Sequence, residues 1–185
     1  MGKRIASEAP LARLAFLPFA PKTVWQKLVD DEAGLAFVTG MKLPEAKFLP
    51  GIEESFCVIQ RKGHPRGNGP ITLEQFCSVE HVLVSPEGGG FVGAADKVLG
   101  DLGYRRKVAI SLPSFLLAPA LVSRTDYICL LPRRLAELYE DVIDLVEAPF
   151  PAPTFQVDLL WHPRRQHDPS HIWFRSQVKK LVSAA

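Results

Sequence analysis

The chain has 185 residues, of which 47% are hydrophobic and 23% charged, a balance typical of a protein that buries a core. This composition excludes a disordered chain. The 22 basic and 20 acidic residues give a formal charge of +2, and the basic residues fall in scattered pairs. Charge alone therefore does not indicate a nucleic-acid-binding surface.

The first third of the chain has the pattern of a strand, a helix and a second strand. Residues 11–19 (LARLAFLPF) form an apolar run that predicts a strand ending in a proline turn. Pro21 and Thr23 open a predicted helix, which Gly34 closes. Residues 35–39 (LAFVT) are short and continuously apolar, which predicts a buried strand. Together these elements predict one βαβ crossover.

The centre of the chain alternates between helices and strands. Residues 41–54 have the pattern of a loop, residues 55–60 predict a strand, and residues 65–70 (PRGNGP) have the composition of a linker. The alternation that follows predicts a parallel sheet covered by helices. The predicted helices lie at 72–79, 91–102, 115–123 and 133–139, and the predicted strands lie at 81–85, 107–112, 127–131 and 142–146.

A second proline-rich segment, residues 148–153 (APFPAP), precedes a predicted strand at 155–161 and an amphipathic helix at 170–182. It and the Gly/Pro-rich segment at 61–70 bracket the central α/β region. We therefore expect two lobes, with the chain leaving the first lobe and returning to it. The expected first lobe is 1–63 with 153–185, and the expected second lobe is 64–152.

Three cysteines, Cys57, Cys77 and Cys129, each lie inside an apolar run. An odd number of such thiols is typical of a reduced, cytoplasmic protein rather than of a disulfide framework. The N-terminus lacks the apolar segment of a secretory signal, and the apolar run at 115–122 is too short to span a bilayer. We therefore expect a cytoplasmic protein without a membrane anchor.

Five segments together carry a family pattern, and the run LLWHPRR followed by DPSHIWFR is its most distinctive part. The segments are residues 24–40, 55–65, 81–88, 111–136 and 155–175, and they cover nearly the whole chain. They resemble the LysR-type transcription regulators, and within that family the subgroup that senses small aromatic compounds and includes the nodulation regulators.

This resemblance implies a periplasmic-binding-protein-like (type 2) α/β fold, with two lobes joined by two crossing strands. It also implies a small-molecule effector in the cleft between the lobes and a cytoplasmic homo-oligomer. Complete family members begin with a helix-turn-helix, whereas this chain enters at Leu11, at the second strand of the sensor domain. We therefore expect an N-terminally truncated first lobe, no DNA binding by this chain alone, and pairing with itself or with a full-length regulator. Gly34 also stands where the family usually has Asp.

The expected effector site combines this resemblance with the ends of the predicted strands, where open α/β sheets bind their ligands. The expected effector is a small aromatic or carboxylated molecule. Ser114 also stands where a helix N-cap belongs, so capping is an alternative role for it. The apolar wall is expected from Phe19, Met41, Phe115 and Ile128, and the polar anchors are expected from Thr39, Ser85 and Ser114.

One motif favours a different function, a small α/β enzyme or a nucleotide-binding module. Gly88 to Gly93 (GGGFVG) fits G-x-G-x-x-G between a predicted strand and a predicted helix. The next strand, however, ends in SLPS and lacks the acidic residue that binds a ribose. A turn whose free N–H groups face the cleft, where they could hold a carboxylate, is therefore favoured.

Three histidines, His162, His167 and His171, have side chains that bind metals, but a proline-broken loop separates them. We expect them to be surface residues. No nucleophile and base occur at a chemically defined spacing, so we expect no catalytic residues, no cofactor and no metal, and a protein that is not an enzyme.

Overall fold

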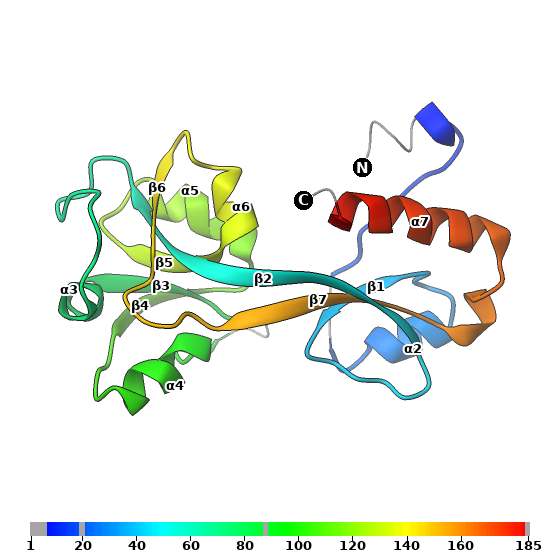
Figure 1. Cartoon of the computed structure of the whole chain (residues 1–185), viewed down its shortest axis with the longest axis horizontal. Helices are drawn as coiled ribbons and strands as arrows, with labels where there is room; N and C mark the ends of the chain where they lie inside the picture. The colour runs from blue at the N-terminus through cyan, green and yellow to red at the C-terminus, as the bar shows by residue number, and fades with distance from the viewer. Residues whose placement is uncertain (1–6, 19–20, 87–88, 184–185) are drawn as a thin grey trace. The chain divides into compact units, whose positions relative to one another are not determined.

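The computed structural model describes residues 7–18, 21–86 and 89–183, and the chain folds into two compact units (Figure 1). Unit 1 contains the described residues up to Glu53 and from Phe155 onward, and unit 2 is Glu54–Thr154. The chain leaves unit 1 inside strand β2 (Lys47–Arg61) and returns at the start of strand β7 (Thr154–Trp161). The first crossing therefore lies within a strand, ahead of the Gly/Pro-rich turn expected to mark it.

Unit 2 is built on a mixed sheet with the strand order β2-β5-β3-β4, and β6 (Ile143–Val146) pairs with β2. Strand β3 (Glu80–Val84) lies parallel to both β4 (Lys107–Leu112) and β5 (Ile128–Pro132). Strand β2 is antiparallel to β5 and to β6. The predicted parallel sheet is therefore confirmed for β5, β3 and β4.

Helices cover both faces of this sheet, because successive residues of a strand point to opposite sides. Cys57 and Cys129 pack in one core cluster with α5 and α6, whereas Val58 and Ile128 pack in a second cluster with α3 and α4. Figure 1 shows the resulting three layers. The helices are α3 (Leu73–Ser78), α4 (Ala94–Asp101), the 3-10 turn η1 (Phe115–Leu117), α5 (Ala118–Val122) and α6 (Arg133–Glu137).

Helix α3 is short, and a capping box together with ring packing holds it. The Thr72 hydroxyl accepts from the Gln75 amide (3.2 Å), and the Gln75 side chain accepts from the Thr72 amide (3.0 Å). The fully buried ring of Phe76 packs edge-on against Phe150 and His81. Since a helix of this length is unstable alone, these tertiary contacts supply most of its stability.

Unit 1 contains helix α2 (Val24–Val29), strand β1 (Ala36–Thr39), strand β7, the turn η2 (Pro163–Arg165) and helix α7 (Pro169–Ser183). Val24 and Leu28 of α2 pack against the buried side of β1. The described part of the predicted strand at 11–19 forms no strand, and β1 pairs antiparallel with β7. The predicted βαβ crossover is therefore wrong, because the apolar run finds no sheet partner.

The three cysteines are free thiols, as predicted; Cys57 and Cys129 are fully buried and Cys77 is partly buried. Burial raises the pKa of Cys57 to about 11 and that of Cys129 to about 12. Within the described ranges, no helix has the length and apolar character needed to cross a membrane.

Candidate functional site

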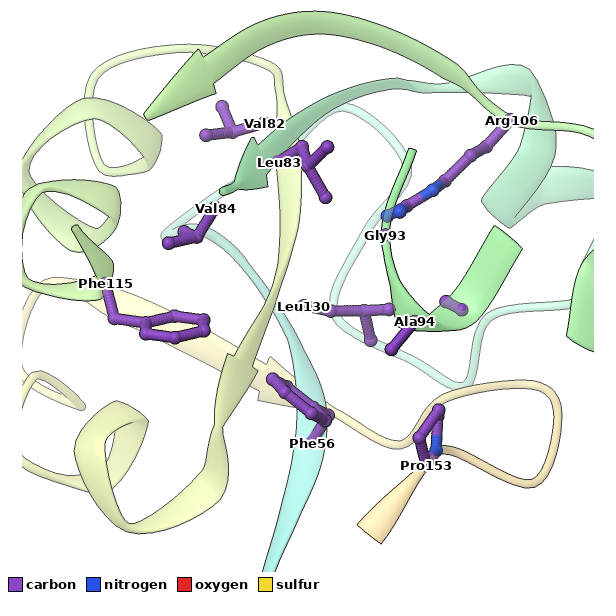
Figure 2. A pocket seen from close by; sticks show the side chains of 11 residues that line it. Phe56, Val82, Leu83, Val84, Gly93, Ala94, Arg106, Phe115, Leu130 and Pro153 are labelled. Atoms are coloured by element: carbon purple, nitrogen blue, oxygen red, sulfur yellow. The ribbon is translucent and has the colours of Figure 1, made fainter. Parts of the chain in front are cut away.

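A pocket of about 160 Å³ lies in unit 2, at the carboxyl edge of its parallel strands (Figure 2). Strands β3 and β4 end side by side, with Val84 opposite Leu112. Phe56 of β2 lies opposite Pro132, the last residue of β5. Residues from different segments therefore line the pocket: 82–84 of β3, 93–95 at the start of α4, Phe56, Arg106, Phe115, Leu130 and Pro153.

Two aromatic rings form part of the wall. The centroids of the Phe56 and Phe115 rings are 6.2 Å apart, with the ring planes tilted by 43°. Both side chains are half-buried, so each presents part of its ring to the pocket. Phe115 follows Ser114, whose hydroxyl accepts from the Leu116 amide (3.3 Å) and caps the turn η1.

The start of helix α4 closes another side of the pocket. A Cβ atom on Gly93 would lie 2.7 Å from the Leu83 side chain, so glycine lets the helix approach β3 closely. The Gly93 amide donates to the carboxylate of Asp96 (2.5 Å). The expected free amide at this position is therefore wrong, because Asp96 of the same helix already occupies it. Gly88, at the other end of the glycine motif, lies outside the described residues.

Arg106 is the charged residue of the lining, and it is fully paired with Asp96. Its Nε donates to Asp96 Oδ1 (2.8 Å) and its Nη2 to Asp96 Oδ2 (2.7 Å). The side chain of Arg106 is 2% exposed and that of Asp96 is 21% exposed. Burial raises the pKa of Asp96, but the hydrogen bonds from Arg106 and the Gly93 amide outweigh this effect and leave it below its usual value. The pair is therefore ionised at neutral pH, with no net charge.

Comparison with known proteins identifies the family. A family model described as the LysR substrate binding domain matches residues 3–183. The chain belongs to the LysR substrate-binding domain family. It is 32% identical over 182 residues to the HTH-type transcriptional activator NahR of Pseudomonas putida, covering 97% of this chain and 60% of NahR. It is 28% identical over 180 residues to nodulation protein D 1 of Bradyrhizobium diazoefficiens, covering 93% of this chain and 55% of that protein.

The solved structures agree with this assignment. A probable transcriptional regulator from Pseudomonas aeruginosa is 28% identical and superposes with a TM-score of 0.82, over 96% of this chain and 59% of that one. The fold is thus the periplasmic-binding-protein-like α/β fold of LysR regulatory domains. The chain spans less than two thirds of the length of these relatives. The names of NahR and of the Pseudomonas aeruginosa protein describe transcriptional regulators.

Three of the predicted site residues of this LysR substrate-binding domain lie at the carboxyl edge of the unit 2 sheet. Phe115 lines the pocket, Ser114 caps the turn beside it, and Ser85 follows β3, where its amide donates to the Leu112 carbonyl (2.8 Å). Ile128, in contrast, is fully buried in the core. It is the first residue of β5, at the amino edge, and Leu130, two residues later on the same face, lines the pocket instead.

The other predicted residues belong to unit 1 or lie outside the described residues. Thr39 is exposed at the end of β1, and Met41 is half-buried against the cluster around α2. Phe19 is outside the described residues. A separate pocket of about 390 Å³ in unit 1 is lined by residues 13–18, 32–37, Val24, Lys27 and Phe174, and it includes neither Thr39 nor Met41.

The histidines have structural contacts. His171 was expected at the surface, but it is buried on α7, with Nε2 2.7 Å from the Gly34 carbonyl oxygen. His162 stacks on Trp25, with ring centroids 5.3 Å apart. Among the described residues, no three His, Cys, Asp or Glu side chains are grouped to hold a metal ion. Gly34, where the family usually has Asp, thus contributes its backbone carbonyl to a contact with α7.

Proposed function

We propose that this chain is the effector-binding part of a LysR-type transcription regulator, and that the unit 2 pocket receives the apolar part of a small aromatic effector. The position supports this proposal, because ligands of open α/β sheets bind outside the carboxyl ends of the strands. Phe115, Ser114 and Ser85 all follow strands that end at this edge. Family membership supports the regulatory role.

The size of the pocket limits the part of the effector that can enter it. Cavities that enclose drug-sized ligands measure roughly 300–1,000 Å³. An apolar cavity of roughly 150 Å³ holds one benzene molecule. At about 160 Å³, this pocket accommodates one aromatic ring. The two phenylalanine rings offer tilted aromatic contacts, which favour an aromatic ligand over an aliphatic one of the same volume.

Calorimetric and thermal-shift titration with benzamide, phenol and naphthalene tests this proposal. Benzamide and phenol should raise the Tm in a concentration-dependent way, whereas naphthalene should raise it less, because only one of its two rings fits within the pocket volume. Phe56→Ala should weaken benzamide binding. Phe48→Ala, which removes a largely exposed ring from β2 in unit 1, is the matched control and should leave it unchanged. Absence of any shift with the single-ring probes would remove the pocket as the effector site.

We further propose that the effector controls transcription in the cytoplasm through a homo-oligomer or an assembly with a full-length regulator. NahR is named as a transcriptional activator and the similar Pseudomonas aeruginosa protein as a probable transcriptional regulator, which supports this role. Large exposed apolar side chains at Leu11 and Phe16 of unit 1 are consistent with self-association. Multi-angle light scattering should show an oligomer, and a stable monomer at micromolar concentration would contradict this part of the proposal.

A further inference from the structure

A buried arginine in a ligand pocket usually indicates a bound anion, because its guanidinium forms two parallel hydrogen bonds with a carboxylate. Arg106 has the required burial and lines the pocket. Figure 2 shows its side chain reaching toward Gly93 at the start of α4. The two parallel hydrogen bonds are, however, already made to Asp96 of the same chain.

Asp96 is held firmly in this position. Its carboxylate accepts from Arg106 through both oxygens and also from the Gly93 amide, which belongs to the N-terminal turn of α4. A negative charge in the first turn of a helix is additionally favoured by the helix dipole. A ligand carboxylate would have to displace a group that is bound in three places.

Among the described residues, the rest of the pocket lining adds no charge that could hold an anion. The other lining residues are apolar or glycine. His81 also interacts electrostatically with both members of the pair, and burial lowers its pKa to about 4, so it is neutral at pH 7. The charges around the pocket therefore cancel.

We propose that the pocket selects an uncharged single-ring ligand, and that Asp96 determines this specificity by neutralising Arg106. The inference rests on the proposed function, namely that a ring enters this pocket. A neutral ring leaves the ion pair intact and gains apolar contact. A carboxylated ring must either compete with Asp96 for Arg106 or be buried unpaired beside a like charge, and both are unfavourable.

Benzamide and benzoate test the charge preference, since they have nearly the same shape and differ in charge at pH 7. Calorimetry on the whole chain should show benzamide binding more tightly than benzoate by about tenfold or more, which corresponds to about 1.4 kcal/mol or more, because like charges brought together repel. Asp96→Asn keeps an acceptor for the Gly93 amide and leaves the Arg106 cation unneutralised. In this variant, benzoate should bind at least as tightly as benzamide.

Two further variants control for structural effects. Asp101→Asn removes an exposed carboxylate from the same helix, where it pairs with Lys97, and should leave the wild-type preference unchanged. The double variant Asp96→Asn, Arg106→Gln removes both charges and should again prefer benzamide. It keeps the proposal testable if Asp96→Asn alone does not fold, because an ion pair removed as a whole is better tolerated than one broken in half.

The outcomes separate the two proposals. If benzamide and benzoate bind the wild-type chain equally well, or if the double variant prefers benzoate, the specificity inference is overturned while the pocket stands. An unchanged preference in folded Asp96→Asn overturns the role of Asp96. If neither probe binds wild type or any variant, the proposed function of this pocket fails, and the inference fails with it.

Discussion

Replacing Phe115 with alanine tests the site most directly, because this ring forms part of the pocket wall but is only half-buried in the fold. The substitution removes the ring that faces Phe56 at 6.2 Å and opens the pocket on that side. A bound ring then loses one of its two aromatic neighbours. The protein should keep its fold, because Phe115 packs at the margin of the core cluster and not within it.

The expected loss of affinity follows from the contact area. An aromatic side chain contributes about 1–3 kcal/mol through roughly 40–120 Å² of apolar contact at about 25 cal/mol per Å². Benzamide should therefore bind about 5- to 150-fold more weakly to Phe115→Ala. Ser114→Ala should change affinity by less than about twofold, since the hydroxyl caps η1, and should instead cost about 1 kcal/mol of stability.

Calorimetric titration combined with urea unfolding separates these effects. Trp173→Ala, on α7 in unit 1, serves as a third variant and should lower the free energy of unfolding without changing the Kd for benzamide. Phe115 does not contact the ligand if Phe115→Ala retains the wild-type Kd for benzamide while its unfolding curve shows an intact fold. If Ser114→Ala weakens binding as much as Phe115→Ala does, the assignment of Ser114 to capping alone is wrong.

Three further predictions concern stability. His81 is fully buried, and burial lowers its pKa from 6.5 to about 4. The stability linked to its neutral form is therefore present above pH 6.5, and about 3 kcal/mol of it is lost as the pH falls toward 4. His81→Gln should flatten the plot of unfolding free energy against pH over this range. A wild-type curve that is level between pH 6.5 and 4 would contradict this. Thr72→Ala removes the capping box of α3 and should cost about 1 kcal/mol in urea unfolding, whereas an unchanged midpoint would show that the cap contributes nothing. Gly93→Ala places a methyl group against Leu83 and should lower both the Tm and benzamide affinity; a fully wild-type variant would show that α4 can move away freely.

The central strands could be predicted from the sequence because their signals are local. The predicted strand at 107–112 coincides with β4, and the predicted strand at 81–85 differs from β3 by one residue at each end. Strand β2 begins at Lys47, eight residues before the predicted start at 55, and its early part contains Pro50 and Gly51, which are typical of turns. That part pairs by backbone hydrogen bonding with β7, a partner more than a hundred residues away, and no local pattern reports such a pairing.

The site could be predicted in part for the same reason. Phe115 lies three residues after the end of the predicted strand at 107–112, so the rule that ligands of open α/β sheets bind outside the carboxyl ends of the strands predicts its place in the site. Arg106 precedes β4, at the opposite end of that strand, and reaches the pocket only through the length of its side chain. Its ion-pair partner, Asp96, is ten residues earlier in the sequence and lies on α4. Two residues at these places form a bidentate pair only once the helix has packed on the sheet, so sequence spacing gave no signal for them.

The position of Asp96 couples ligand specificity to folding, and this coupling is itself testable. The carboxylate caps α4 and neutralises a guanidinium that is 2% exposed. Removing Asp96 therefore leaves an uncompensated buried cation, whereas removing Arg106 leaves a partly exposed carboxylate without its partner. A double-mutant cycle between Asp96→Asn and Arg106→Gln should give a coupling energy of about 1–3 kcal/mol in urea unfolding. The same cycle for Lys97 and Asp101, an exposed pair on the same helix, should give no measurable coupling energy. Equal coupling energies in the two cycles would mean that solvent screens the interaction between Arg106 and Asp96. In that case the ion pair would not explain a preference of the pocket for an uncharged ring over an anionic one.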